Sequence, residues 1–459
     1  MRSSRTRNYE MDMCNGPLFT KLVVFAVPVM ISGILQLLFN AADVIVVGRF
    51  AGRESMAAVG STTSLINLLI NLFIGLSIGT NVLVAQFFGA KKEKELEETI
   101  HTSMLLALLG GFILIAVGGC LAGPILTLMG TPEDVLYLAI LYVQVYFIGM
   151  PATLLYNFGS AILRAVGDTR RPLYYLVTAG IINVILNLFF VIVCKLDVAG
   201  VALASTLSQC VSAALVVRSL AVADAPYHLN LRRLRLVPRR VEAILKIGLP
   251  AGLQGSVFSI SNVLIQSSIN SFGSVAMAGS SAAASIENFV YIAMNAMYQT
   301  SVSFTSQNYG AKKYGRMTKI LVYCLLMVTF VGVVTGVGAC IFGRQLLGIY
   351  SPDEEVIQYG MRRMIIVCAP YFICGLMDTM VGGLRGMGHS IVPMFVSLTG
   401  ACLFRVFWIF TVFAANRTLD VLYYSYPISW TITFLAHVIC YLVIRCHMRK
   451  MGEVERAQA

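Results

Sequence analysis

Four ionisable residues lie within long apolar stretches of the sequence: Asp43, Glu287, Asp378 and Arg405. A charge inside such a stretch is costly, so these residues are candidates for functional sites unless they are paired. Three acids and one base leave an excess of negative charge, which suits a cavity that attracts cations. We therefore expect these side chains to take part in the binding or movement of ions and charged solutes.

The first of these acids follows an amide on the same helix face. Asp43 lies six residues before Arg49, which places it about 9 Å from the outer boundary of its helix. Asn40 is three residues earlier and shares the face of Asp43. Asp43 and Asn40 are therefore candidates for binding a coupling ion or proton. The alternative is that Asp43 is a structural cap or the partner of Arg49.

Two further amides have the spacing of one helical turn. Asn183 and Asn187 are four residues apart, so their side chains lie on one face of a helix. An amide oxygen can ligate a cation, but an amide cannot release a proton as a carboxylic acid does. Both residues are ion-coupling candidates, and hydrogen bonding between neighbouring helices is the alternative.

The other three charges belong to the second half of the chain and are candidates for lining a cavity there. Glu287 lies 11 residues into its apolar stretch and Arg405 lies 12 residues from Arg417, so both are about 17 Å deep. Equal depth predicts that Glu287 and Arg405 form an ion pair. Asp378, 15 residues from Arg363 and about 22 Å deep, is the competitor for Arg405. The acid that remains unpaired, by preference Asp378, is expected to attract a cationic substrate or coupling ion.

The composition indicates which elements hold these side chains. Of the 459 residues, 58% are hydrophobic and only 12% are charged, and the mean hydropathy is +0.79. Soluble domains contain about 25% charged residues. Lipid must therefore be the solvent for most of the surface, which excludes a soluble protein.

Continuous apolar runs predict an all-α integral membrane protein, because a helix needs roughly 20 apolar residues to cross a bilayer. The sequence predicts twelve spans, near residues 22–48, 57–88, 100–124, 135–160, 172–194, 198–218, 247–270, 276–306, 320–343, 364–384, 391–415 and 421–444. The seventh and eighth spans form one uncharged stretch, and Ser271–Ser274 is the predicted turn between them.

Lysine and arginine are distributed unequally between the connecting segments. With the N-terminus inside, the inner segments hold 26 of these residues and the outer segments hold 7. This asymmetry predicts that both termini are cytoplasmic, and it explains the net charge of +12 without a nucleic-acid partner. The basic run Arg232, Arg233, Arg235, Arg239 and Arg240 is interpreted as a cytoplasmic topogenic linker, with lipid or partner binding as the lesser alternative.

The two halves of the sequence repeat each other. Residues 85–92 read AQFFGAKK and residues 306–313 read SQNYGAKK. Residues 163–172 read LRAVGDTRRP and residues 384–393 read LRGMGHSIVP. Both matches have the same offset of 221 residues, which indicates an internal duplication.

The duplication predicts the domain organisation. Each half has an even number of spans, so both halves enter the membrane in the same direction. We expect two six-helix lobes, residues 1–221 and 243–459, joined by a cytoplasmic linker at 222–242. The lobes should be related by a pseudo-two-fold axis along the membrane normal, an arrangement typical of alternating-access transporters.

The whole chain, from about residue 20 to 445, resembles the multidrug and toxic compound extrusion (MATE) family of bacterial type. The resemblance is carried by Pro28, Asn40 and Asp43, AAVGS at 57–61, QFFGAKK at 86–92, LRAVGDTRRP at 163–172, INVILN at 182–187, VAGVALASTLSQ at 198–209, QNYGAKK at 307–313 and LRGMGHSIVP at 384–393. It implies a sodium- or proton-driven antiporter that exports organic, often cationic, compounds.

The resemblance also implies roles for particular residues, with departures. In such families the first-span acid, here Asp43, is an ion or proton site. One branch typically has Asp at the position of Asn187, so a proton relay in the first half would depend on Asp43 alone. Other branches carry a Glu in the seventh span, which this sequence lacks, and a tenth-span acid about one turn from Asp378.

Other functions are less well supported by the sequence. The leading alternative is a flippase for a lipid-linked oligosaccharide or lipid, but such cavities are richer in Arg and Lys. An enzyme is not expected, because the five histidines are dispersed and no HExxH motif occurs. We expect small-molecule substrates, contact with membrane lipids, no cofactor beyond the coupling sodium ion or proton, no metal site, and function as a monomer in the cell membrane.

Overall fold

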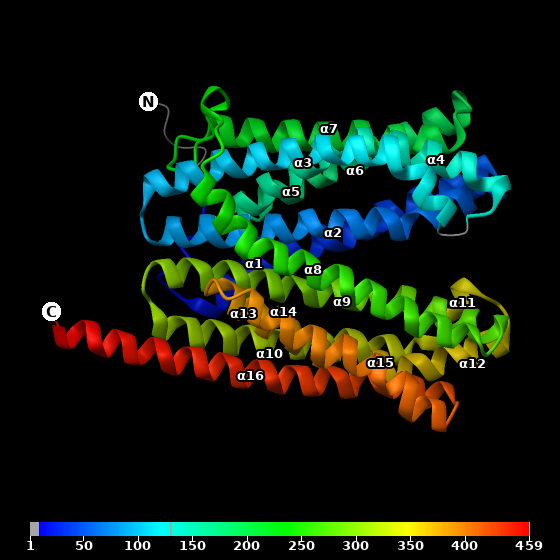
Figure 1. Ribbon diagram of the computed structural model, residues 1–459. Coiled ribbons are helices and arrows are strands. Elements are labelled where there is room, and N and C mark those ends of the chain that lie inside the picture. The colour runs from blue at the N-terminus through cyan, green and yellow to red at the C-terminus, as the bar shows by residue number, and fades with distance from the viewer. Residues whose placement is uncertain (1–8, 129–130, 459) are drawn as a thin grey trace. The chain divides into compact units, whose positions relative to one another are not determined.

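The computed structural model describes residues 9–128 and 131–458, and every regular element in these ranges is a helix (Figure 1). The α-helices are α1 (Leu18–Val46), α2 (Arg53–Gly89), α3 (Glu93–Leu128), α4 (Glu133–Ile148), α5 (Met150–Ala165), α6 (Arg170–Leu188), α7 (Asp197–Val222), α8 (Pro238–Asn270), α9 (Ser274–Gly310), α10 (Tyr314–Ile341), α11 (Gly343–Tyr350), α12 (Glu354–Arg363), α13 (Phe372–Gly386), α14 (Ile391–Ser397), α15 (Phe404–Trp408) and α16 (Leu419–Gln458). The other helical segments are η1 (Val47–Ala51), η2 (Phe189–Val193), η4 (Met364–Cys368), η5 (Leu398–Leu403) and η6 (Ile409–Phe413), all π-helical, and the 3-10 turn η3 (Leu231–Arg233).

The helices account for the predicted spans. Among the described residues, nine helical segments are long and apolar enough to cross a membrane, and two bent helix pairs raise this number to eleven. The 37-residue α9 corresponds to the remaining predicted span. Each of the twelve predicted spans therefore has a helical counterpart, and the chain is an all-α integral membrane protein with two six-helix lobes.

Two of the spans are bent at proline. The pair of α4 and α5 bends by 48° next to Pro151. In the second pair, α12 and η4 together form one arm and α13 forms the other, with a bend of 41° next to Pro370. Proline removes a backbone hydrogen bond and its ring clashes with the preceding turn, so it interrupts a helix that would otherwise continue. The turn predicted at 271–274 is confirmed, since α8 ends before it and Gly273 has a φ of +95°.

The 221-residue repeat is also present in the backbone. Helices α2 and α9 begin and end exactly one repeat apart, and the starts of α3 and α10 and of α6 and α14 have the same offset. Left-handed backbone conformations recur in the same way, at Gly52 and Gly273, at Lys91 and Lys312, and at Gly167 and Gly388. The duplication therefore preserved turn geometry where side chains changed. The two-fold axis expected to relate the lobes stays a prediction.

The chain divides into two compact units, which we describe separately. The first unit comprises Met1–Leu253 and Ser306–Lys312, and the second comprises Gln254–Thr305 and Lys313–Ala459. The division therefore falls within α8 and near the end of α9. The domain bounds expected from the repeat, with a linker at 222–242, stay a prediction.

Close backbone approach explains why the first half of α8 packs with the first unit. A Cβ atom added to Gly75 of α2 would lie 2.2 Å from the backbone nitrogen of Gly252, and one added to Gly79 would lie 2.6 Å from the Ile244 carbonyl oxygen. Near its end, α2 meets α9 in the same manner, with Gly89 against the backbone of Gln307. Small residues permit such crossings where helices cannot rely on the hydrophobic effect for association.

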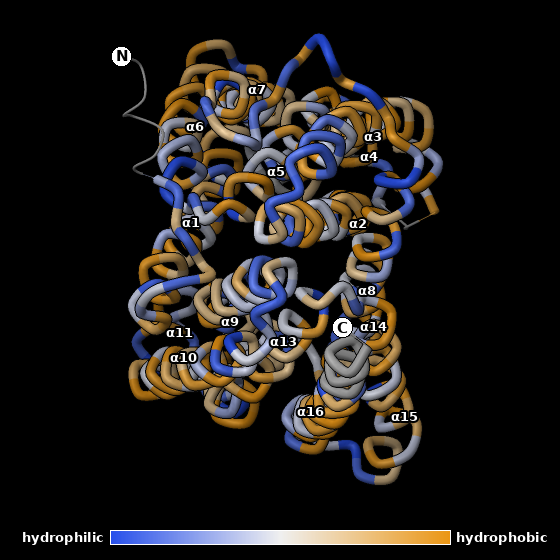
Figure 2. Tube along the Cα trace, turned by 90° about the vertical axis from the view of Figure 1, so that its left-hand side faces the viewer, coloured by the Kyte–Doolittle hydropathy of each residue, from blue (hydrophilic) through white to orange (hydrophobic). Residues whose placement is uncertain are grey.

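The surface is that of a protein solvated by lipid. Hydrophobic residues occupy long stretches of the helices, and hydrophilic residues gather in the connecting segments (Figure 2). Large apolar side chains on α10 and η6 are exposed, among them Phe330 at 69% and Phe410 at 77%. In water such exposure would cause association, but in a bilayer it is the expected state of the surface.

Candidate functional site

Asp43 of α1 is held by polar side chains of α6 and α7. Its Oδ1 accepts a hydrogen bond from Nδ2 of Asn187, and its Oδ2 accepts one from Oγ of Ser205 at 3.4 Å. The carboxyl group is half-buried. No basic side chain lies within ion-pairing distance of it among the described residues, so the pairing with Arg49 considered as an alternative does not occur.

Asn183 closes this set into a ring, which we call the Asp43 network (Asp43, Asn183, Asn187 and Ser205). The Oδ1 of Asn183 accepts a second hydrogen bond from Asn187 Nδ2 at 3.2 Å, and its Nδ2 donates to Ser205 Oγ at 3.3 Å. The Oδ1 of Asn187 is buried and has no hydrogen-bond partner among the described residues. A carboxylate beside an unsatisfied amide oxygen suits a small cation, because both groups are oxygen ligands.

Two tyrosines of α4 complete the surroundings of Asp43. Tyr142 and Tyr146 stack with ring centroids 5.8 Å apart, and both interact electrostatically with the Asp43 carboxylate. The helices that carry Asp43 and Asn187 change to π-helical geometry immediately afterwards, in η1 and η2. Such π segments often occur at functional sites.

The prediction that Asn40 shares this site receives no support from its contacts. Its side chain is exposed, and no hydrogen bond joins it to the Asp43 network in the described structure. A separation of three residues leaves two side chains about 60° apart around the helix, so one can face a neighbouring helix while the other does not. Asn183 and Asn187, in contrast, are both buried and bonded within the network.

In the second unit, Glu287 of α9 forms an ion pair with Arg363 of α12. The contact is bidentate, with Nε to Oε1 at 2.9 Å and Nη2 to Oε2 at 2.8 Å. Arg363 Nη1 also donates to Ser280 Oγ at 2.8 Å. The predicted pair between Glu287 and Arg405 is therefore wrong. Arg363 was assigned to an outer connecting segment, but it is the last residue of α12 and only 6% exposed.

Arg405 lies among aromatic rings instead. Its guanidinium carbon is 4.4 Å from the ring centroid of Tyr426 and 5.7 Å from that of Trp430. Nε donates to Ser429 Oγ at 3.0 Å, and Nη1 donates to Asn262 Oδ1 at 3.5 Å. Among the described residues no carboxylate lies within 4 Å of this guanidinium, so Asp378 is not its partner either.

Asp378 of α13 is half-buried and interacts with the Tyr291 hydroxyl and, at longer range, with Arg385. Arg385 is itself occupied by neutral groups, donating to the Tyr298 hydroxyl at 2.7 Å and to Gln254 Oε1 at 2.8 Å. Glu287, Asp378 and Arg405 thus belong to the same unit, but they do not form one cluster. The excess of acid expected in the second half is absent once Arg363 and Arg385 are counted with Arg405.

Sequence reasoning missed several contacting residues. Ser205 lies in the motif VALAST, where a small polar residue in an apolar helix could have been noted as a hydrogen-bond donor. Tyr426 and Trp430 are four residues apart, a spacing that places two rings on one helix face. The Arg363 contact was missed because Arg363 was counted as an outer residue, whereas it ends α12 and is buried.

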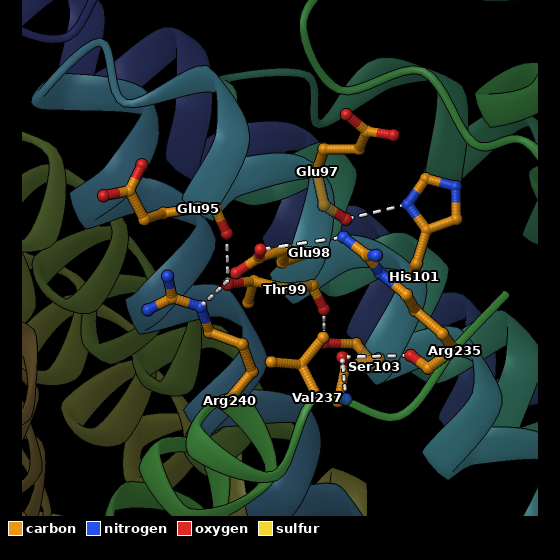
Figure 3. A network of polar contacts seen from close by, with 10 residues as sticks. Glu95, Glu97, Glu98, Thr99, His101, Ser103, Arg235, Val237 and Arg240 are labelled. Carbon is orange, nitrogen blue, oxygen red and sulfur yellow. Dashed lines mark hydrogen bonds and ion pairs between the residues drawn. The ribbon is translucent and has the colours of Figure 1, made fainter. Parts of the chain in front are cut away.

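The segment after α7 is fixed to α3 by a second polar network (Figure 3). His101 Nε2 accepts a hydrogen bond from the backbone nitrogen of Asn230 at 3.0 Å. Thr102 Oγ1 donates to the Arg235 carbonyl and accepts from the Val237 backbone nitrogen, both at 3.2 Å. The segment around η3 is therefore held against α3 by hydrogen bonds between its own backbone and the side chains of His101 and Thr102.

Charged side chains support the same attachment. The Glu98 carboxylate accepts a hydrogen bond from Arg240 Nε at 3.2 Å and lies 3.6 Å from Arg235 Nη2. The Arg240 guanidinium also covers the ring of Phe87 at 4.9 Å. A cleft of about 510 Å³ beside Glu98 and Arg235 is lined by charged side chains of both signs, by His101 and by Leu234. Its three bases outnumber its two acids by one, and Glu98 is paired with Arg235 and Arg240. We assign the cleft a structural role. The cytoplasmic location of this segment stays a prediction.

No group of three or more histidine, cysteine, aspartate or glutamate side chains suited to a metal occurs within the described ranges. The Asp43 network contains only one such residue, and its other oxygens come from amides and hydroxyls. It is therefore suited to a monovalent ion or a proton rather than to a tightly held transition metal.

Comparison with known proteins assigns the chain to a family. The family model described as MatE matches residues 28–189 and again residues 250–411. The two matches are of equal length and correspond to the two halves of the repeat.

Curated relatives match over most of their length. The probable multidrug resistance protein YoeA of Bacillus subtilis is 25% identical over 382 residues, which is 82% of each chain. An FAD transporter of Shewanella oneidensis is 23% identical over 395 residues, covering 84% of this chain and 86% of its own. The fold is similar to that of a multidrug resistance MATE family transporter of the MOP superfamily in an outward-facing conformation, with a TM-score of 0.89 at 21% identity and coverage of 95% and 98%.

Proposed function

The chain belongs to the MatE family of membrane transport proteins, and we propose that it is a secondary active antiporter that exports organic compounds in exchange for sodium ions or protons. The observation that carries this proposal is the Asp43 network. It holds one carboxylate without a basic partner inside the first unit, next to the unsatisfied Oδ1 of Asn187. A bound cation or proton would neutralise this carboxylate.

The network can bind the coupling ion in either of two forms. As a carboxylate, Asp43 together with the oxygens of Asn187 and Ser205 can ligate sodium. As a carboxylic acid, Asp43 can carry a proton, whereas the amides around it cannot. Asp43 is thus the only group in the network that can couple export to a proton gradient.

The substrates are proposed to be small amphipathic organic molecules. The names of the relatives support this class, since they refer to multidrug resistance and to FAD. A preference for cations was expected from an acidic excess in the second half, and the Glu287–Arg363 pair removes that reason. The flippase alternative is not favoured, because multidrug proteins and multidrug transporter structures lead the comparisons.

The cellular setting is part of the same proposal. The chain is a multi-span membrane protein, and we propose that it acts in the cell membrane as a monomer with both termini cytoplasmic. Lipids contact its exposed apolar faces. The proposed role requires no catalytic residue, nucleic acid or bound cofactor other than the coupling ion.

Transport by purified protein in liposomes tests the proposal. Export of a lipophilic dye should accelerate when an opposing sodium or proton gradient is imposed. Asp43→Asn should lower this ion-driven export at least about 100-fold while the protein still folds, because the amide can accept one of the two hydrogen bonds but carries no exchangeable charge. Asp224→Asn, which changes an exposed acid of the same unit, is the matched control. Export that ignores both gradients, or that persists in Asp43→Asn, contradicts the proposal.

A further inference from the structure

The second unit contains more buried guanidinium groups than carboxylates to balance them. Arg363, Arg385 and Arg405 are 6%, 4% and 2% exposed, respectively. Away from the helix ends, the acids of this unit are Glu287 of α9 and Asp378 of α13. Glu287 is saturated by Arg363, since both of its oxygens are used. One positive charge therefore remains in excess inside this unit.

Neither Arg385 nor Arg405 has a carboxylate within 4 Å among the described residues. Of the two, Arg405 lies beside an exposed side chain, that of Asn262, and we follow the excess charge there. Arg405 binds only neutral groups, the side chains of Ser429 and Asn262, and its Nη2 donates no hydrogen bond to a described residue. A guanidinium buried at this depth without an anion is costly. An anion supplied from outside the chain would relieve that cost.

The surroundings of Arg405 suit the rest of such a ligand. The ring of Tyr426 packs against Trp430 at 5.7 Å, and Trp430 packs against Tyr371 at 5.1 Å. Tyr371 in turn packs against Tyr291 at 6.4 Å. These four rings form a connected series that begins at the guanidinium, with Tyr426 and Trp430 buried and Tyr371 and Tyr291 half-buried. Planar aromatic groups pack well against such rings.

The site can be approached from one side. Asn262, which accepts from Arg405 Nη1, has an exposed side chain. The contact between the two is long, at 3.5 Å, so it can be exchanged for a stronger one. A guanidinium presents a fork of donors that matches a carboxylate or phosphate in a bidentate manner. Arg363 already has its carboxylate from Glu287, whereas Arg405 does not.

We propose that Arg405, together with the rings of Tyr426 and Trp430, binds the carboxylate or phosphate group of an aromatic organic anion. This inference rests on the proposed function, and it assigns the acidic part of an exported compound to the second unit. The first unit then binds the coupling cation at Asp43. Each unit thus recognises one sign of charge.

Binding of two dyes with the same ring system tests the proposal. The full-length protein is placed in nanodiscs of phosphatidylcholine, and anisotropy titrations compare anionic carboxyfluorescein with cationic rhodamine 6G. Wild type should bind carboxyfluorescein, and Arg405→Gln should weaken that binding at least about 10-fold. Arg405→Lys should lie between them, since it keeps the charge but loses the fork. The affinity for rhodamine should not fall in either variant.

Controls separate a binding role from a folding role. Arg344→Gln, which removes an exposed arginine of the same unit, should leave carboxyfluorescein affinity unchanged. In wild type alone, carboxyfluorescein should raise the melting temperature more than rhodamine does, and this measurement requires no variant. Adding anionic phosphatidylglycerol to the nanodiscs should not displace the dye. Displacement would mean that a lipid phosphate is the occupant and would overturn the assignment to an exported compound.

The outcomes also distinguish this inference from the proposed function. Asp43→Asn should lose ion-driven export but keep Arg405-dependent dye binding. Ion-driven export together with equal dye binding in wild type and Arg405→Gln would overturn the Arg405 site and leave the antiporter intact. Arg405-dependent binding without ion-driven export would contradict the antiporter and leave the Arg405 site standing.

Discussion

The two units share a backbone repeat but differ in the charge that each holds inside. In the first unit an acid lies among amides and a hydroxyl, and in the second unit an arginine lies among aromatic rings. At the offset of 221 residues, the positions of the Asp43 network and its neighbouring tyrosine correspond to apolar, aromatic or basic residues: Asp43 to Leu264, Asn183 to Phe404, Asn187 to Trp408, Ser205 to Tyr426 and Tyr142 to Arg363. Duplication preserved the turns and helix ends, while the two interiors acquired opposite chemistry.

This difference shows how one fold can provide two unlike sites. Helix packing depends on small residues and turn geometry, which recur in both halves. The chemistry depends on a few side chains that point inward and can change without altering the backbone. Fold and function therefore constrain different positions of the same repeat.

The largest expected effect is on stability, and it separates Arg363 from Arg405 among the buried arginines of the second unit. Glu287→Gln should destabilise the protein by about 3–5 kcal/mol, because it leaves Arg363 buried without its carboxylate. The double change of Glu287→Gln with Arg363→Met should recover part of that loss. Thermal or denaturant unfolding of the purified protein measures both effects.

The exposed pair Arg344–Glu354 provides the control for this first prediction. Glu354→Gln should cost less than about 1 kcal/mol, as expected for a solvated ion pair. Rescue of Glu287→Gln by Arg405→Met instead of Arg363→Met would show that the ion-pair assignment is wrong.

The next effect concerns the amide that joins the Asp43 network. Asn187→Ala removes the donor shared by Asp43 and Asn183, together with the unsatisfied oxygen beside the carboxylate. We expect the concentration of coupling ion needed for half-maximal export to rise about 10-fold, equivalent to about 1.4 kcal/mol. Trp408→Ala, at the corresponding position of the second unit, should leave that concentration unchanged. If that concentration rose equally in Asn187→Ala and Trp408→Ala, ion binding could not be assigned to the first unit.

A smaller effect should identify the contribution of the rings near Arg405. Tyr426→Leu removes the ring face 4.4 Å from the guanidinium, and a cation–π contact of this kind is worth about 1 kcal/mol. The affinity for carboxyfluorescein should therefore fall about fivefold in Tyr426→Leu. It should not change in Tyr426→Phe, which keeps the ring. A loss in Tyr426→Phe would point to the hydroxyl group instead.

The smallest effect should come from Ser205. Its hydrogen bond to Asp43 is long, at 3.4 Å, so Ser205→Ala should alter the apparent ion affinity only about threefold, near the lower end of the range for a neutral donor. Ser208→Ala, three residues along the same helix and bonded to the Ser205 carbonyl, is the control. A loss as large as that of Asn187→Ala would make Ser205 an essential ligand.

The sequence predicted the framework and part of the first site. Span positions follow from apolar length, and the turn at 271–274 follows from the lack of charge between two spans. The identical spacing of the repeats predicted that each half is one lobe. Asn183 and Asn187 were predicted to share a face with helical spacing, and both are bonded in the Asp43 network.

The pairing of charges in the second unit could not be predicted from the sequence. Distance along a helix gives depth, but it does not give the direction in which a side chain points. Glu287 and Arg405 were assigned similar depths, yet Glu287 bonds Arg363. Arg363, which was taken as an outer boundary, is itself buried, so counting residues inward from it failed. Asn40 illustrates the same limit, because neighbouring positions on one helix can face different surroundings.

The contact of α2 with α8 and α9 has a consequence for the order in which the chain is synthesised. The first unit includes residues up to 253 and also 306–312, and Gly75 and Gly89 meet backbone from both of these segments. A ribosome that has completed α7 has therefore not yet made everything that the first unit packs against. The nascent unit therefore lacks part of its packing against α2 until the segment that ends at residue 312 has been made. A chain divided at residues 222–242 for expression as two pieces would place both glycine contacts across the cut.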